Sequence, residues 1–317
     1  MTTTDPGAIF LVADARRAGR PRRWIDGDDF DRPYRGLRVT RAEEAEDAAV
    51  PPGQLQRAAI ARAAVHFSAH MHVGEYFSHT TAAVLWDLPL PLLPDALPHV
   101  SVRGRAPRLG GIHGHQIADS LARVVTHPEH GLRVADPATT WAMLGGMLRH
   151  PYDLVAAGDA IVRTPRIPGP TPRMERDAWG TVAELDVALR AGRRRGAAAL
   201  RDALPRIRAG SASRMETWVR LIIVDAGLPE PVTDHDVFDW RGRFVGCVDL
   251  AYPHLRIAIE YEGDQHRTDP RQWQRDIEKH EALADLGWRV IRVSRDHVFS
   301  DPESISRRVR AAIGAQR

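Results

Sequence analysis

The last third of the chain shows the most regular alternation of apolar and polar residues. Residues 214–226 repeat apolar side chains at helical spacing, and Gly227 and Pro229 follow, so a helix is expected to end there. Short alternating runs on both sides of the turn sequence WRGR predict strands. The expected order is a helix, three strands, a helix, a strand and a helix, over residues 211–226, 232–239, 243–252, 256–263, 269–287, 288–294 and 301–313.

Upstream of residue 163 the pattern is mixed and mainly helical. Helices are expected over residues 9–17, 54–65, 78–86, 136–148 and 152–162. Strands are expected over residues 36–40, 99–104 and 111–116. Ser78 and Asp136 each stand just before a predicted helix, where a side chain that caps the first turn is preferred. The fold class predicted for the whole chain is therefore α/β (α+β).

The length of 317 residues suffices for two domains of ordinary size. Residues 164–180 are rich in proline, and residues 181–207 have helical spacing. We therefore predict an N-terminal region over residues 1–163, a Pro-rich linker with a helical connector over residues 164–210, and a C-terminal domain over residues 211–317.

Composition narrows the functional classes. No apolar run approaches the roughly 20 residues of a membrane span, and the start of the chain lacks the pattern of a secretory signal. Cys247 is the single cysteine, which excludes an internal disulfide and a cysteine-based zinc site. We expect a cytoplasmic protein without a membrane partner. The net charge of +3 does not by itself indicate a nucleic-acid partner.

Three acidic residues in the predicted C-terminal strands carry the main chemical signal. Glu260 and Glu262 are two residues apart and so share one face of a strand, and Asp249 lies on the preceding strand. Carboxylates this close repel one another unless a cation lies between them. Hard oxygen ligands favour Mg²⁺ or Mn²⁺. His266 follows the strand, where it could orient or deprotonate a water molecule.

Other interpretations of these residues stay open. Glu260 and Glu262 could instead be charges that protect an exposed edge strand, paired with Arg256 and Arg292. Glu216 lies in the sequence SRME, which is typical of a capping box, so it is either a helix-capping residue or an accessory metal ligand.

A group of histidines precedes the predicted helix at residues 78–86. His66 and His70 are four residues apart and would share one helix face, and His72 and His79 follow. No third ligand accompanies the pair in a recognised zinc-binding frame. We therefore expect these histidines to be ordinary surface or core residues.

The acidic residues also carry a family resemblance. The pattern D…E-x-E-G-x-x-H, followed by RDIEKHEALADLGWRVIRVS, resembles the very-short-patch-repair-type endonuclease domain, a branch of the PD-(D/E)xK restriction-endonuclease-like superfamily. The resemblance covers residues 211 to about 310. It implies an α-β-β-β-α-β core and a Mg²⁺- or Mn²⁺-dependent endonuclease that hydrolyses DNA.

The resemblance also implies site residues. Asp249 takes the aspartate position and Glu260 the acidic position, while Glu262 occupies the usual lysine position. A glutamate there can bind metal but cannot supply positive charge, so either Lys279 on the next helix or His266 with the metal replaces the lysine. Arg275 matches the helix motif of the very-short-patch branch and is expected to contact nucleic acid.

The N-terminal region resembles a second family. The sequences FDRPYRGLRVT, HTTAAVLWDLPLP and RVADPATTWAML are similar to an abortive-infection type IV antitoxin-like region, which often begins with a winged helix. Here the segment before residue 36 leaves little room for a recognition helix. Arg22, Arg23 and Arg35 are expected to contact phosphates, and the region is expected to deliver DNA or a protein partner. The alternative function is a non-catalytic DNA-binding regulator of the antitoxin kind, with a degenerate nuclease domain.

Overall fold

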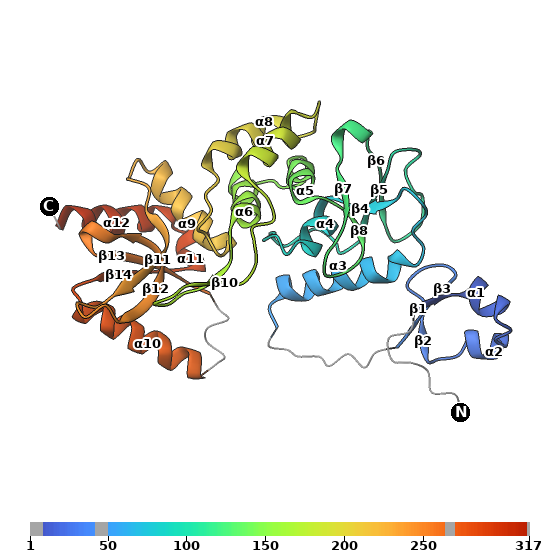
Figure 1. The fold of residues 1–317 in the computed structure, drawn as a ribbon, viewed down its shortest axis with the longest axis horizontal. Helices are drawn as coiled ribbons and strands as arrows, with labels where there is room; N and C mark the ends of the chain where they lie inside the picture. The colour runs from blue at the N-terminus through green and yellow to red at the C-terminus, as the bar shows by residue number, and fades with distance from the viewer. Residues whose placement is uncertain (1–8, 42–49, 264–269, 316–317) are drawn as a thin grey trace. The chain divides into compact units, whose positions relative to one another are not determined.

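A computed structural model describes residues 9–41, 50–263 and 270–315 (Figure 1). The described residues form two compact units. The first comprises those up to Met147 together with Arg190–Arg195, and the second comprises Leu148–Leu189 and those from Gly196 onward. Both units contain helices and sheets, so the predicted mixed α/β class is confirmed. The predicted boundaries at residues 163 and 210 stay a prediction.

The first unit begins with a small sheet of strand order β1-β3-β2. The helix predicted over residues 9–17 is wrong at its start, because Ile9–Leu11 pair with Leu37–Val39 and only Val12–Arg17 are helical. Backbone pairing with the apolar strand therefore outweighs local helical spacing. The elements of this part are β1 (Ile9–Leu11), α1 (Val12–Arg17), α2 (Arg22–Ile25), β2 (Phe30–Asp31) and β3 (Leu37–Thr40).

The rest of the first unit contains a five-stranded sheet of order β6-β5-β4-β8-β7. Asp136 caps α5 as predicted, since its Oδ1 accepts a 2.7 Å hydrogen bond from the N–H of Thr139. The cap predicted for Ser78 is not formed, because its hydroxyl contacts Ser101 and His79 instead. The elements are α3 (Pro52–Ser68), β4 (Tyr76–Phe77), α4 (His79–Leu85), β5 (His99–Val102), β6 (His113–Gln116), η1 (Asp119–Leu121), β7 (Val124–Thr126), β8 (Arg133–Ala135) and α5 (Pro137–Leu144).

Helices and a short hairpin open the second unit. The helical stretch predicted over residues 181–207 is interrupted before Gly196, whose φ of 73° lies in the left-handed region that favours glycine. The elements are α6 (Pro151–Val162), β9 (Arg166–Ile167), β10 (Arg173–Met174), α7 (Val182–Arg190), α8 (Ala197–Ala203) and η2 (Leu204–Arg206).

None of the helices formed by the described residues combines the length and apolar character that a bilayer crossing requires.

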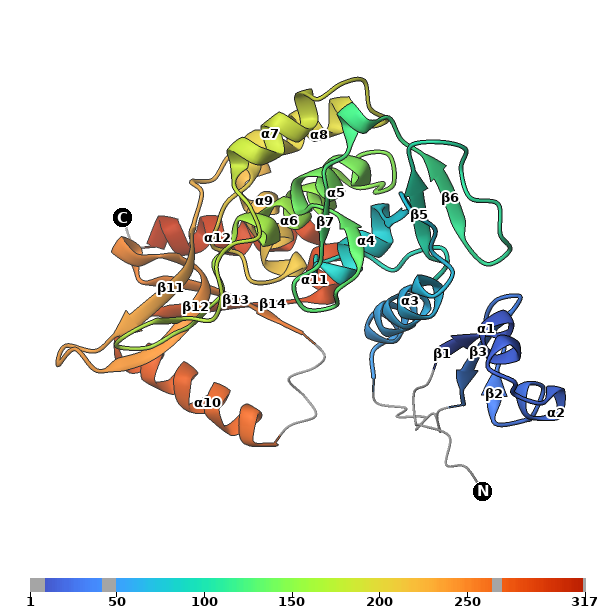
Figure 2. The ribbon, with the colours of Figure 1, turned by 45° about the vertical axis from the view of Figure 1, so that its right-hand side comes forward.

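A four-stranded sheet with helices on both faces completes the second unit (Figures 1 and 2). Its order is β11-β12-β13-β14, and only β13 and β14 run parallel. Ile257 and Ile259 face a core shared with α9 and α12, and Ala258 faces the side that α10 covers. The elements are α9 (Arg214–Asp225), β11 (Val232–Phe238), β12 (Phe244–Tyr252), η3 (Pro253–Leu255), β13 (Ile257–Glu262), α10 (Pro270–Asp285), β14 (Arg289–Ser294), α11 (Arg295–Phe299) and α12 (Pro302–Ala315).

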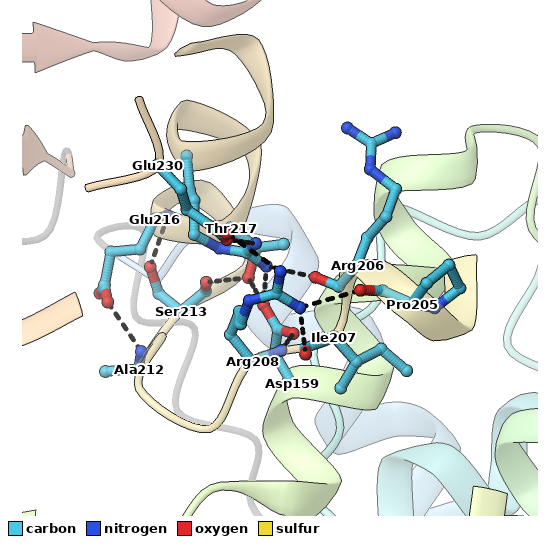
Figure 3. Close-up of polar contacts among 11 residues, drawn as sticks. Asp159, Pro205, Arg206, Ile207, Arg208, Ala212, Ser213, Glu216, Thr217 and Glu230 are labelled. Carbon is cyan, nitrogen blue, oxygen red and sulfur yellow. Dashed lines mark hydrogen bonds and ion pairs between the residues drawn. The ribbon is translucent and has the colours of Figure 1, made fainter. Parts of the chain in front are cut away.

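A network of charges, buried at Asp159 and Arg220, joins α6 to α9 (Figure 3). Asp159 of α6 accepts hydrogen bonds from the Thr217 hydroxyl, from the backbone N–H of Arg208 and from Nη2 of Arg220 at 2.6–2.8 Å. Arg220 is 1% exposed and also donates to Glu230 at 2.8 Å, and Glu230 accepts from Arg208 at 2.9 Å. We call these five residues the arginine network. Two arginines face two carboxylates in it, so the formal charges balance.

A second aspartate of α6 makes a similar connection. Oδ1 of Asp153 accepts hydrogen bonds from Nε of Arg214 at 2.7 Å and from the indole N–H of Trp218 at 2.8 Å. Both donors belong to α9. The helix that leads into the four-stranded sheet is therefore bonded to α6 through two buried carboxylates.

Candidate functional site

The antiparallel pairing of β12 and β13 brings Asp249 and Glu260 together. Leu250 pairs with Ile259, and the two acidic residues each lie one position beyond this pair. Oδ2 of Asp249 accepts a 2.7 Å hydrogen bond from the backbone N–H of Tyr261. Adjacent positions on neighbouring strands place side chains about 5 Å apart, which is the arrangement expected from the sequence pattern.

Lys279 of α10 reaches the same place from the helix that covers this side of the sheet. Its Nζ lies 2.7 Å from Oε2 of Glu260 and 3.1 Å from the carbonyl oxygen of Cys247. Gly246 of β12 makes room for it, because a Cβ there would lie 2.7–2.8 Å from Cδ and Cγ of the lysine. The glycine thus lets the lysine stem lie against the strand.

The charges of this cluster do not balance. We call Glu216, Asp249, Glu260 and Lys279 the acidic cluster. Burial and the nearby charges of Glu216 and Glu260 raise the pKa of Asp249 well above its usual value. Burial would raise the pKa of Glu260 too, but hydrogen bonds from His280 and Lys279 outweigh it and hold that pKa below its usual value. The cluster therefore contains a carboxylate held ionised beside one that resists ionisation.

Glu216 takes the capping role considered for it from the sequence, and its role as an accessory metal ligand stays a prediction. Its backbone N–H donates to Oγ of Ser213 at 3.2 Å, and its Oε2 accepts from the N–H of Ala212 at 2.7 Å (Figure 3). These bonds cap the start of α9. Burial raises the pKa of Glu216, and its charge raises the pKa of Asp249. Capping therefore holds a third carboxyl group near the first two.

Glu262 lies apart from the acidic cluster. Its Oε1 makes an ion pair with Nε of Arg292 on β14. The role of Glu262 as a metal ligand stays a prediction, and it requires Arg292 to move aside. Glu260 and Glu262 share a strand face, but they have different cationic partners. Glu260 is paired with Lys279, and Glu262 is paired with Arg292.

The remaining predicted residues are spread over both units. His266 lies outside the described residues. Arg22, Arg23 and Arg35 are exposed in the first unit, and Arg275 is exposed on α10 of the second. Of these, Arg22 also approaches Asp26, with Nε at 3.4 Å from Oδ2.

Sequence reasoning missed two further side chains of the second unit that contact its acidic residues. Nε2 of His280 lies 3.4 Å from Oε2 of Glu260, and its position directly after Lys279 was the available signal. Arg166 of β9 is paired with Asp234 and Asp236 of β11, at 2.7 and 2.5 Å. It comes from the segment predicted to be a linker, and no local pattern indicated the contact.

A divalent cation is the cofactor that the sequence pattern implies, and the residues present fit one. Oε1 of Glu260 is buried and has no hydrogen-bond partner among the described residues. A buried polar atom without a partner is costly, and a bound cation removes this cost. Within the described residues no three acidic side chains place ligand atoms within 4.8 Å of one another. The described residues thus do not bring the three predicted carboxylate ligands Asp249, Glu260 and Glu262 together, and a Mg²⁺ ion here would be held by one or two carboxylates with water and substrate oxygens.

Comparisons with known proteins match a family over the segment that contains Asp249, Glu260 and Lys279. Residues 245–313 match the restriction-endonuclease-like family REase_MTES_1575. The chain is also similar to two uncharacterized proteins of Mycobacterium tuberculosis, MT2308 of strain CDC 1551 / Oshkosh and Rv2248 of strain ATCC 25618 / H37Rv. Each is 30% identical over 203 residues, which cover 64% of this chain and 68% of the relative. The chain belongs to the family of these two proteins, and its C-terminal part is restriction-endonuclease-like.

Proposed function

We propose that this member of the family is a metal-dependent endonuclease that hydrolyses phosphodiester bonds in DNA. The observation that carries the proposal is the 2.7 Å contact between Lys279 and Glu260, whose other oxygen stays buried beside Asp249 without a partner among the described residues. Carboxylates that can hold a cation, next to a lysine that can face a phosphate, are the charges that phosphodiester hydrolysis requires.

Asp249 and Glu260 would hold Mg²⁺ or Mn²⁺, with Glu216 as an accessory ligand. When bound, such an ion polarises a phosphoryl oxygen and makes a nucleophile of water at neutral pH. The carboxylates themselves orient the site: Asp249 is fixed by the N–H of Tyr261, and Glu260 by Lys279 and His280. These fixed positions are the preorganisation that hydrolysis needs.

Lys279 would stabilise the negative charge that develops on the phosphate during hydrolysis. It thus takes the part of the lysine that the sequence lacks at position 262. His266 would assist by accepting a proton from the attacking water, as the sequence pattern suggests. Arg275 of α10, together with Arg22, Arg23 and Arg35 of the first unit, would contact DNA phosphates.

The likeness to the very-short-patch branch suggests that mismatched duplexes belong among the substrates to be tested. The antitoxin-like character of the N-terminal region, and a protein partner bound through it, are proposals of the same kind. The non-catalytic regulator was considered because Glu262 stands where a lysine is usual. The contact of Lys279 with Glu260 supports the enzyme over the regulator.

The test is cleavage by the purified full-length chain. Supercoiled plasmid and short single-stranded, double-stranded and mismatched DNA are incubated with Mg²⁺, Mn²⁺ or EDTA, and Asp249→Asn serves as the inactive variant. We expect nicks with either metal, none with EDTA and none with the variant. If the protein binds DNA but cleaves none of these substrates, the non-catalytic regulator becomes the supported function in place of the enzyme. Equal cleavage by the variant would place the active centre elsewhere.

A further inference from the structure

Three histidines that are distant in sequence meet in the first unit. His79 starts α4 directly after β4, His99 starts β5, and His115 lies in β6. These strands are neighbours in the sheet, in the order β6-β5-β4. One potential ligand atom from each imidazole lies within 4.8 Å of the others. Of the histidines suspected from the sequence, only His79 belongs to this group.

The rings are in direct contact. Nδ1 of His99 lies 2.8 Å from Nε2 of His115. The ring centroids of His79 and His115 are 4.0 Å apart, and those of His99 and His115 are 5.0 Å apart. His79 is 9% exposed and His99 is 6% exposed. Three imidazoles are thus packed together in a largely buried place.

Burial keeps these rings neutral. It lowers the pKa of His79 to about 2 and that of His99 to about 3, and it lowers the pKa of His115 as well, with the neighbouring histidines adding to the effect. A neutral imidazole offers a lone pair on one nitrogen, which is the form that binds metal ions.

The surroundings of the rings resemble the outer shell of a metal site. Oγ of Ser78 lies 2.9 Å from Nδ1 of His79, which fixes that ring and leaves Nε2 for another partner. Asp95 contacts Nε2 of His113 at 3.1 Å, and the ring of His113 packs on His99 with centroids 4.6 Å apart. A carboxylate next to the cluster would lower the cost of adding a divalent cation.

The backbone at the cluster is also specialised. His79 has a φ of 51°, a left-handed conformation that is uncommon for a residue other than glycine. A Cβ on Gly114, between His113 and His115, would lie 2.0 Å from the carbonyl oxygen of Pro107. The loop before β6 therefore packs closely against that strand at the glycine. This packing helps to hold His113 and His115 in their register with β5.

We propose that His79, His99 and His115 form a binding site for a divalent transition-metal ion of the zinc class. Three imidazoles suit Zn²⁺ and leave one position for water. The ion would replace the hydrogen bond between His99 and His115 and join β5 and the edge strand β6 to the start of α4. The site lies in the first unit and does not involve the acidic cluster, so it is independent of the proposed nuclease activity.

The experiment uses full-length protein that carries Asp249→Asn, so that the acidic cluster does not contribute, after removal of metals with EDTA. Zn²⁺ is titrated by calorimetry, and Co²⁺ by its visible absorption. We expect one Zn²⁺ per chain and a rise in melting temperature. His115→Gln and His79→Gln should each weaken binding by about 100-fold or more, because loss of a ligand should exceed loss of an outer partner. The exposed His130 provides the control, His130→Gln, which should bind as the parent does.

A further variant identifies the ligand directly. His115→Cys keeps a metal-binding side chain at that position, and thiolate coordination gives Co²⁺ a charge-transfer band that the parent lacks. Circular dichroism checks that each variant is folded. Absence of Zn²⁺ binding by the folded parent would overturn the proposal. Unchanged affinity in both glutamine variants, or a cysteine variant that binds Co²⁺ without the new band, would overturn it as well.

Discussion

The second unit contains two groups of charges that differ in how their carboxylates are paired. Each group holds one buried atom without a hydrogen-bond partner among the described residues, Nε of Arg220 or Oε1 of Glu260. In the arginine network each carboxylate meets an arginine, and Asp159 accepts three hydrogen bonds. In the acidic cluster three carboxyl groups share one lysine, and Oε1 of Glu260 has no partner among the described residues. Removing one partner of a buried ion pair leaves the other charge unpaired, which is costly, and carboxylates in excess of their cations are costly unless a ligand completes the group. We therefore expect disruption of the arginine network to cost stability and disruption of the acidic cluster to cost the proposed cleavage.

Glu260→Gln should have the largest effect of these variants. It should lower the rate of cleavage and leave the stability of the fold nearly unchanged. The amide keeps the size of the side chain but weakens cation binding, so we expect cleavage to fall by about 10³–10⁴-fold, or roughly 4–5.5 kcal/mol of barrier. Plasmid nicking rates measure this, and the exposed Glu281→Gln on α10 is the matched control. Urea unfolding of the variant should remain close to that of the wild type. A strongly destabilised variant with normal activity would reverse the assignment of roles.

Arg220→Met should have the opposite profile. Removing the 1% exposed guanidinium leaves the buried Asp159 without its ion-pair partner and leaves Glu230 with Arg208 alone, which should cost about 3–5 kcal/mol of stability. Urea unfolding followed by tryptophan fluorescence gives the value. Arg208→Met is the control, since that side chain is 44% exposed and should cost much less. Equal losses in the two variants would show that burial and balance do not set the contribution.

Lys279→Met tests whether the lysine serves catalysis or only neutralises Glu260. The variant keeps the stem and removes the charge, and we expect a loss of about 10²–10³-fold in cleavage, a typical cost for removing one group that stabilises developing charge. Single-turnover cleavage with saturating Mn²⁺ measures the step itself. A purely structural lysine would give lower stability and an unchanged rate in the folded protein.

Gly246→Ala should lower cleavage by about 10–100-fold, because the new Cβ displaces the lysine stem and a small misplacement of a catalytic group is costly. The rate of the folded protein is the measurement. Gly314→Ala is the control, since nothing lies within 4 Å of a Cβ at that helical position. If Gly246→Ala retains full activity while Lys279→Met does not, the glycine has no positioning role.

The smallest expected effect is a pH-dependent gain of stability in Asp249→Asn, measured with EDTA present. The folded state binds the Asp249 proton more tightly than the unfolded chain does, because its pKa is raised. This contribution to stability is fully present below the unfolded pKa of about 3.9, and it is lost as the pH rises through the folded pKa. The variant should therefore exceed the wild type by of the order of 1 kcal/mol at about pH 8 and match it near pH 4.

Asp225→Asn provides the comparison of opposite sign. Burial would raise the pKa of Asp225, but hydrogen bonds from Tyr152 and Arg206 lower it overall. Its stabilising contribution is therefore present at neutral pH and is lost as the pH falls through the folded pKa. Unfolding curves at several pH values should show this variant below the wild type at neutral pH and equal to it in acid. The same sign for both variants would contradict the opposite directions of the two pKa shifts.

The sequence predicted the acidic cluster in part, for a clear physical reason. Asp249 and Glu260 lie on strands joined by a short turn, and the two-residue period of strands places their side chains beside each other. Whether Lys279 could replace the lysine missing at position 262 depended on how α10 lies on the sheet, which Gly246 helps to determine by close packing. No periodic pattern encodes a contact of that kind.

The histidine cluster shows a different limit. His99 and His115 lie on the parallel strands β5 and β6, and His79 begins the helix that follows β4, the other neighbour of β5. The spacing of four between His66 and His70 was visible because a helix makes local spacing meaningful. Pairing between strands carries no such local signal, so the three ligands could not be grouped before the sheet was known.

The bonds from Asp153 and Asp159 to α9 have a consequence for where the gene of this protein can recombine. A gene rearrangement that joined a new N-terminal region directly to residue 211 would bring Arg214 and Arg220 without the carboxylates that they meet on α6. The joined product would begin with a loss of stability that later substitutions had to repair. Recombination at a point before Leu148 avoids this loss of stability, since α6 and α9 are then inherited on one segment. We therefore expect relatives with unrelated N-terminal regions to retain both aspartates and both arginines as a set.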